Sequence, residues 1–228
     1  MKVNKTILIT GVSSGIGLAL ANNYFCNGWN VIGTIRDDVF IDDLRCKYRF
    51  EVVHLDLALE TSINDIQKHL GDRTIDILVN NAGIRGEEGA ILDRDVNEYY
   101  DILKVNCIAP INLVKNIYQN LEKSSNPYII NISSILGSIQ GNYSGGWCAY
   151  RISKSSLNML TRTMAIEFKE HNICCVAISP GWVRTKIGGK RGVLSPVQCA
   201  DKLFNTIGSL SMSDSGRFID EEGNDIPF

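Results

Sequence analysis

The chain has 228 residues, of which 44% are hydrophobic and 21% charged, and its formal net charge at pH 7 is -2. This composition is typical of a folded globular protein and argues against disorder. Because no charge of one sign dominates, neither nucleic acid nor an anionic membrane is an expected partner. The first residues lack a signal-peptide pattern, and no segment approaches the roughly 18 apolar residues of a membrane span. We therefore expect a cytoplasmic protein.

The seven cysteines and three histidines show no metal-ligand spacing. The cysteines are scattered, no two of them form a C-x-x-C motif, and no histidine has a cysteine or histidine companion at ligand spacing. We expect reduced thiols and no metal site.

Six apolar runs rich in β-branched residues predict strands at residues 6–10, 30–34, 51–55, 75–80, 128–133 and 173–179. Several runs are continuously apolar, as in strands buried on both faces. Helical spacing between them is marked by Ile16, Leu20 and Tyr24, and by Leu113, Ile117 and Leu121. This alternation predicts an α/β fold with one doubly wound (Rossmann) parallel sheet and helices on both faces. No linker divides the chain, so residues 1–228 are expected to form one domain.

A glycine-rich turn at residues 10–17 follows the first predicted strand and opens the first predicted helix. Its glycines permit close approach to a pyrophosphate, and the helix N-terminus offers unpaired N–H groups and a favourable dipole. The spacing is G-x-x-x-G-x-G, not the commoner G-x-G-x-x-G. The turn also satisfies the G-x-S-x-G nucleophile elbow of a hydrolase, with Ser13 as nucleophile and His171 as its best-placed histidine. That alternative lacks an earlier strand to supply an oxyanion hole.

Tyr150 and Lys154 lie four residues apart at the start of a predicted helix and therefore share one face. A free phenol has a pKa of about 10, and a nearby ammonium lowers it. Tyr150 is thus a candidate proton donor or acceptor. The same pair is common on ordinary helix surfaces, so it becomes informative only beside other motifs.

Several motifs occur in a fixed order: the turn at 10–17, Asn80-Asn81-Ala82-Gly83, Asn106, Ser133-Ser134, Tyr150-x-x-x-Lys154 and Pro180-Gly181. In this order they resemble the short-chain dehydrogenase/reductase family over essentially the whole chain. Segments 145–151 and 223–228 are similar to the C-factor and sniffer-type carbonyl reductases of that family. The resemblance implies an NADP(H)-dependent oxidoreductase that transfers hydride between nicotinamide and a carbonyl or alcohol. The alternative is a non-catalytic dinucleotide-sensing or signalling module of the same fold.

The resemblance assigns catalytic roles to four residues. Tyr150 exchanges a proton with the substrate oxygen, Ser134 hydrogen-bonds that oxygen, and Lys154 lowers the pKa of Tyr150 and holds the nicotinamide ribose. Asn106 holds a water that links Lys154 to solvent. Ser133 remains the alternative to Ser134, because neighbours in a strand face opposite sides and the fifteen residues between Ser134 and Tyr150 exceed the number in many family members.

The resemblance also implies a set of cofactor contacts. Asp56 contacts the adenine amine, Asn80 and Ala82 line the adenine side, and Thr185 binds the nicotinamide carboxamide or a phosphate oxygen. Besides Tyr150 and Lys154, the other residues expected against the cofactor are Gly11, Ser13, Ser14, Gly15, Ile16, Gly17, Leu57, Gly83, Pro180, Gly181 and Val183.

The residues after the second predicted strand indicate which nicotinamide is used. Ile35 occupies the position that carries an acid in NAD users of the family, and Arg36 follows it, where a guanidinium can bind the NADP phosphate. We therefore expect NADP and regard NAD as the less favoured alternative. Asp37 and Asp38 come next, and a shift of one residue in register would restore an acid.

Segment 181–195 carries four glycines together with Lys186, Lys190 and Arg191. It predicts a mobile loop at the carboxyl end of a strand, where ligands bind in open α/β sheets. A lid and a solvated surface loop both remain open. This loop, Tyr143, Trp147 and Trp182 are expected to shape the pocket of a small-molecule substrate. A homodimer or homotetramer is expected by resemblance, with helices at about 95–121 and from Tyr150 onward at its interface.

Overall fold

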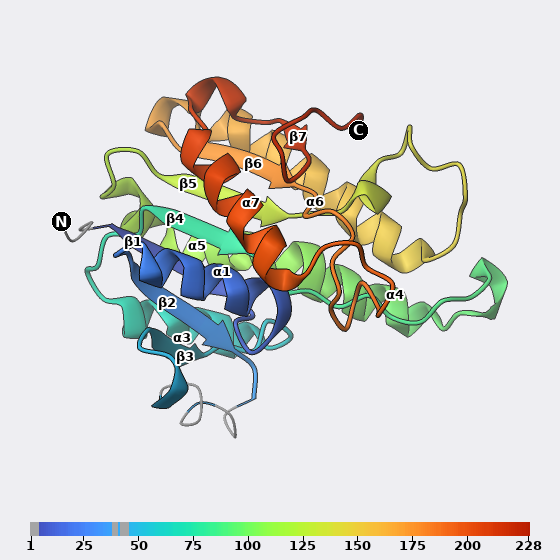
Figure 1. The fold of residues 1–228 in the computed structure, drawn as a ribbon, viewed down its shortest axis with the longest axis horizontal. Coiled ribbons are helices and arrows are strands. Elements are labelled where there is room, and N and C mark those ends of the chain that lie inside the picture. Colours follow the sequence, from blue (N-terminus) through green and yellow to red (C-terminus); the bar gives the residue numbers. More distant parts are fainter. Residues whose placement is uncertain (1–4, 38–40, 42–45) are drawn as a thin grey trace.

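The computed structural model describes residues 5–37, 41 and 46–228. They build one seven-stranded sheet in which every neighbouring pair of strands is parallel, in the order β3-β2-β1-β4-β5-β6-β7 (Figure 1). The predicted doubly wound α/β fold is confirmed. The order reverses between β1 and β4, which lie side by side although the chain visits β2 and β3 between them. In such sheets this reversal marks the place where a ligand binds.

The strands begin and end close to where their apolar runs predict. They are β1 (Thr6–Thr10), β2 (Asn30–Ile35), β3 (Glu51–His54), β4 (Ile77–Asn80), β5 (Tyr128–Ile132), β6 (Cys174–Ile178) and β7 (Phe218–Ile219). The seventh strand was not predicted. It has only two residues, which pair with Ala177 and Ile178 of β6, so its sequence carries no measurable apolar run.

Helices cover both faces of the sheet (Figure 1). One face packs against α1 (Gly15–Cys26) and α7 (Pro196–Ser209), and the other against α3 (Glu60–Leu70), α5 (Ala109–Glu122) and α6 (Cys148–Glu167). A further helix, α4 (Val96–Leu103), continues into a π-helical turn at Lys104–Ile108 and then into α5. Within the described ranges, no helix has both the length and the apolar character needed to span a bilayer.

The predicted helical stripes form the two cores. Leu113, Ile117 and Leu121 are fully buried on α5, whereas on α1 Leu20 and Tyr24 are buried and Ile16 is half-buried. The Tyr24 ring makes edge contacts with the rings of Trp29 and Phe204, at centroid distances of 5.1 and 4.9 Å. Because Phe204 belongs to α7, these contacts join the two helices that cover this face.

Candidate active site

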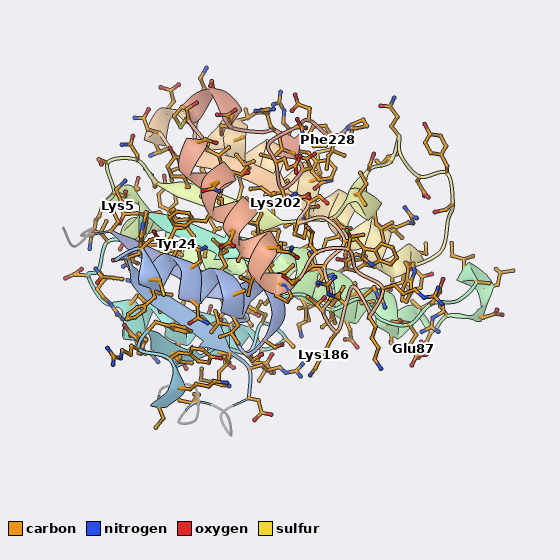
Figure 2. The ribbon with its side chains drawn as sticks, in the orientation of Figure 1. Lys5, Tyr24, Glu87, Lys186, Lys202 and Phe228 are labelled. Carbon is orange, nitrogen blue, oxygen red and sulfur yellow. The ribbon has the colours of Figure 1, made fainter. Side chains whose placement is uncertain are left out.

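A cleft of about 2240 Å³ runs along the carboxyl ends of the central strands. Its walls come from the turn after β1 and from the loops that follow β2, β3, β4, β5 and β6. Figure 2 shows Lys186 and Glu87 on loops at the end of the sheet toward which the strand arrows point. This volume exceeds the few hundred to roughly 1,000 Å³ of a typical small-ligand pocket, so it has room for a long ligand and a second molecule.

The glycine-rich turn forms one end of the cleft. All six of its predicted cofactor residues line it: Gly11, Ser13, Ser14, Gly15, Ile16 and Gly17. No side chain caps the first turn of α1, which also contains no acidic residue. Its N–H groups and positive dipole end therefore remain available to an anion. A Cβ on Gly17 would lie 2.3 Å from the Gly11 carbonyl oxygen, so only glycine allows the helix to begin this close to the turn.

The loops after β2 and β3 line the same part of the cleft. Arg36 is exposed there beside Ile35 and Asp37, while Asp38 lies outside the described residues. After β3, Asp56 accepts a hydrogen bond from the Ala58 backbone N–H at 2.8 Å through Oδ1. Asp56 and the buried Leu57 both line the cleft, as expected of cofactor contacts.

Asn80 does not reach the cleft, contrary to expectation. Its side chain is buried and donates to Asn131 Oδ1 at 2.8 Å, and Asn131 in turn donates to Thr161 Oγ1 at 2.8 Å. This chain of hydrogen bonds ties β4 to β5 and β5 to α6. The Asn80 side-chain amide is therefore committed to Asn131 inside the protein and does not face a ligand.

Asn81, Ala82 and Gly83 line the cleft instead. Thr10 holds this segment, since its hydroxyl accepts from the backbone N–H groups of Asn81 and Ala82, both at 3.0 Å. The Asn81 side chain donates back to the Thr10 carbonyl at 2.7 Å. The strand ends on either side of the topological reversal are thereby fastened to one another.

The two serines after β5 face different sides. Ser133 borders the cleft but is buried, and its hydroxyl proton is already used in a hydrogen bond to Asn158 Oδ1 at 2.6 Å. Ser134 is half-buried, and its Oγ accepts from the Leu136 N–H at 3.1 Å and hydrogen-bonds the Tyr150 phenol. The geometry therefore brings Ser134, not Ser133, beside Tyr150.

Tyr150 and Lys154 lie in the first turns of α6, and both are buried, with exposed fractions of 7% and 4%. Lys154 Nζ lies 5.6 Å from the centre of the Tyr150 ring and donates to the Ile132 carbonyl at 2.8 Å. Burial lowers the pKa of Lys154 to about 8. The two side chains share one face and line the cleft, as their spacing predicts.

The expected lowering of the Tyr150 pKa by Lys154 is not found. Burial raises the pKa of Tyr150 to about 12, and the opposing influences are the Ser134 hydrogen bond and the charge of Arg85. Lys154 is itself desolvated and loses its proton near pH 8, so it is no constant source of positive charge. The phenol therefore stays protonated at neutral pH.

Asn106 lies in the π-helical turn, a local geometry often found at functional sites. Its Oδ1 accepts from the Ile84 N–H at 2.8 Å, and its Nδ2 donates to the Ile84 carbonyl at 2.7 Å and to Ser153 Oγ at 2.9 Å. The side chain thus fixes the loop after β4 against α6. The side chain does not line the cleft, and its expected part in holding a water next to Lys154 stays a prediction.

The loop after β6 contributes Pro180, Gly181, Val183 and Thr185 to the cleft wall, as expected. The loop is braced from within: Trp182 Nε1 donates to the Gly188 carbonyl at 2.7 Å, and the Gly188 N–H donates to Thr185 Oγ1 at 2.9 Å. Lys186, Lys190 and Arg191 also line the cleft, so this loop forms part of the wall around the ligand space.

The hydrolase alternative is contradicted by the fold. Ser13 follows β1 and lies at the carboxyl ends of the strands. His171 precedes β6 and therefore lies at the opposite edge of the same parallel sheet, where its Nδ1 is 3.1 Å from Glu122 Oε1. The two side chains cannot form a catalytic pair.

Sequence reasoning missed one functional candidate and misplaced another. Arg85, two residues after the Asn81-Ala82-Gly83 segment, lines the cleft and acts electrostatically on Tyr150. Its only sequence signal was its closeness to that motif. Tyr143 is 92% exposed and does not line the cleft, whereas Trp147 and Trp182 do.

Comparison with known proteins agrees with this geometry. The family described as short chain dehydrogenase matches residues 5–192. The C-signal of Myxococcus xanthus is 30% identical over 154 residues, covering 68% of this chain and 93% of that protein.

Two solved structures are similar over nearly their full length. The carbonyl reductase Sniffer of D. melanogaster has a TM-score of 0.91 and 31% identity, covering 99% of this chain and 100% of its own. The NADPH-bound carbonyl reductase from chicken fatty liver has a TM-score of 0.91 and 31% identity, covering 99% of both chains. The family match covers well over half of the chain, and the sequence motifs and the cleft agree with it. The chain belongs to the short-chain dehydrogenase family and is an oxidoreductase.

Proposed function

We propose that this protein reduces a ketone or aldehyde with NADPH, with Tyr150 as the general acid. The proposal rests mainly on the buried Tyr150 phenol, which is hydrogen-bonded to Ser134 and has the Lys154 Nζ near its ring. The glycine-rich turn lines the same cleft. A module that only senses a dinucleotide needs no such proton donor. For that reason we favour the enzyme over the signalling alternative.

The residues present suit a dinucleotide. The open first turn of α1 can bind the pyrophosphate, and the cleft extends from there to Tyr150 and Lys154. NADPH, when bound, supplies the hydride to the carbonyl carbon. Lys154 Nζ and Tyr150 are the polar groups that would meet the nicotinamide ribose.

Each catalytic residue has a task that follows from its contacts. The Tyr150 phenol, with a pKa raised by burial to about 12, stays protonated and gives its proton to the substrate oxygen as negative charge develops there. The Ser134 hydroxyl accepts from Leu136, so its proton is the one that bonds Tyr150, and with a substrate in place it can be donated to the substrate oxygen instead. Lys154, with a pKa lowered by burial to about 8, can exchange protons near neutral pH and restore the phenol.

The cofactor proposed is NADP(H), because the exposed Arg36 stands at the end of β2 and lines the cleft. An Arg36→Gln variant should raise the KM for NADPH by about 10- to 100-fold, since a guanidinium–phosphate pair is lost. The KM for NADH should change little. Arg49→Gln, an exposed arginine outside the cleft, is the matched control. Equal effects of Arg36→Gln on both cofactors would contradict the assignment.

The activity test incubates purified protein with NADPH and a panel of neutral ketones and aldehydes and follows the loss of NADPH fluorescence. Turnover of at least one carbonyl compound, faster with NADPH than with NADH, is the expected result. Intact NADPH binding with no turnover of any carbonyl would favour the sensing alternative.

We also propose a cytoplasmic homo-oligomer that pairs through α4, α5 and α6. Large apolar side chains are exposed along this face, among them Tyr100 on α4 and Ile152, Met159 and Ile166 on α6. The three α6 residues are seven apart and therefore form a single stripe. A second copy of this face would cover them.

A further inference from the structure

A cation faces the proton donor in the cleft. Arg85 lies on the loop after β4, is half-buried and lines the cleft beside Tyr150, Ser134 and Trp147. It is close enough for its charge to act on the Tyr150 phenol. A positive charge at this place attracts a negatively charged group of any molecule bound next to Tyr150.

The Arg85 guanidinium rests on an aromatic platform. Its Cζ lies 3.7 Å from the centre of the Trp147 ring, the distance at which a flat guanidinium contacts a ring through its face. Such a contact uses none of the N–H donors at the edge of the guanidinium. The donors therefore stay free to bind a planar anion in two-point fashion.

The platform itself is held firmly. Trp147 has a φ of 50° and follows Gly145 and Gly146, whose φ values of 61° and 69° are also left-handed. Three consecutive left-handed residues are costly for the tryptophan and need external support. Arg151, almost buried on α6, donates to the Gly145 carbonyl at 2.8 Å, the Gly146 carbonyl at 2.9 Å and Ser144 Oγ at 2.9 Å.

Arg85 has no protein anion. In the described ranges, no carboxylate forms an ion pair or hydrogen bond with it, although Glu87 and Glu98 lie nearby in sequence. Both of those carboxylates are bound to Arg94. Glu221, another acid of the cleft wall, pairs with Lys202 at 3.5 Å. Glu88 and Asp101 also line the cleft, but among the described residues neither forms an ion pair with Arg85. Glu87, Glu98 and Glu221 are therefore held by other cations, and the Arg85 charge has no carboxylate of the described residues bound to it.

We propose that Arg85 is a specificity residue that binds a carboxylate of the substrate, so that the preferred substrates are oxo acids. The inference rests on the proposed reductase function and names its substrate class. A half-buried guanidinium with free edge donors is an incomplete ion pair, which a substrate carboxylate near the reacting carbonyl completes. Ile135 and Leu136, which also line the cleft, offer apolar surface for the carbon skeleton.

The test compares oxo acids with their ethyl esters, which keep the same reacting carbonyl but replace the carboxylate charge by a neutral ester group. Benzoylformate and ethyl benzoylformate, and a 4-oxo acid with its ester, are each assayed with NADPH for kcat/KM. The wild-type protein should favour at least one acid over its ester. Arg85→Gln should lower that acid-to-ester ratio by about 10- to 100-fold, the effect of losing a charge-assisted pair. Arg94→Gln, on the same loop but bound to Glu98, should leave the ratio within about twofold.

The ratio isolates binding of the carboxylate from any general effect of Arg85 on Tyr150, because both substrates use the same proton donor. Reduction of esters with no preference for any acid, or an unchanged ratio in Arg85→Gln, would overturn this inference and leave the reductase function standing. Turnover of neither acids nor esters, nor of the neutral carbonyl panel, would instead overturn the reductase function.

Discussion

Ser133 and Ser134 are chemically identical neighbours whose environments give them different tasks. Ser133→Ala removes a buried hydroxyl that donates to Asn158, so it should cost about 1–3 kcal/mol of stability and leave kcat within a few fold. Ser134→Ala removes the hydroxyl beside Tyr150 and should lower kcat by about 100-fold with little change in stability. Urea denaturation and steady-state kinetics on both variants check this, and a reversal of the two patterns would assign the role to Ser133.

Lys154 should make the stability of the protein without cofactor depend on pH. Below pH 8 the lysine is protonated in both the folded and the unfolded chain, so the cost of burying its charge is fully present. Between pH 8 and about 10.5 only the unfolded chain keeps the proton, so this cost disappears as the pH rises. Lys154→Met has no such group. The variant's stability relative to wild type should therefore fall by about 2 kcal/mol between pH 7 and pH 9.5.

The measurement is urea denaturation of both proteins at the two pH values. Taking the difference between variant and wild type cancels the other groups that affect stability in this range. Examples are the thiols of Cys174 and Cys199, which lose their protons near pH 9 in the unfolded chain but keep them in the folded protein, where burial raises their pKa values to about 12. A difference that is the same at both pH values would mean that Lys154 keeps its proton when buried.

For individual residues, the sequence predicts which ones lie near each other, but their hydrogen bonds and burial are known only from the structure. Tyr150 and Lys154 share a face because four residues make about one helical turn. Neither the pKa of Tyr150 nor the placement of Asn80 was predictable, since both depend on burial by distant segments. Arg85 carried no signal of its own, because its partner Trp147 is 62 residues away in the sequence.

Among the elements, α6 has two tasks on different faces. Its first turns hold Tyr150 and Lys154 in the cleft, while Ile152, Met159 and Ile166 are exposed elsewhere on the helix. Met159→Glu should disrupt the proposed oligomer, because a carboxylate would be buried between two copies. Sedimentation velocity should then show monomers where wild type shows dimers or tetramers.

Val197→Glu on α7 is the control, since Val197 is 63% exposed and lies outside the α4–α6 face. A wild-type protein that sediments as a monomer, or an oligomer untouched by Met159→Glu, would exclude this interface.

The strands and helices were predictable where one local pattern determines them. Continuous apolar runs predicted the strands from β1 to β6 to within two residues at either end, because strands buried on both faces need no polar side. The two-residue β7 and the π-helical turn at Lys104–Ile108 were not predictable. Both depend on contacts with other elements and not on propensity.

At the scale of the whole molecule, distant parts of the chain make one site. The glycine-rich turn, the loop after β4, the start of α6 and Ile226 near the C-terminus all line the same cleft. The C-terminal residues also fasten the base of the loop between β5 and α6, since the Pro227 carbonyl accepts from Ser138 Oγ at 2.5 Å and the Phe228 carbonyl from the Gln140 N–H at 2.9 Å. The order of the motifs predicted that these segments form one site, and the strand order explains why they lie at the same edge of the sheet.

Tyr150 is proposed to donate its proton to a substrate that is reduced at this cleft. The most direct measurement compares wild type with Tyr150→Phe, which removes only the phenolic hydroxyl, at saturating NADPH and a neutral carbonyl substrate. NADPH affinity is measured by fluorescence on the same samples. We expect kcat to fall by about 10²- to 10⁴-fold while the Kd for NADPH changes less than about tenfold. A variant that binds NADPH and reduces the carbonyl at the wild-type rate would contradict it.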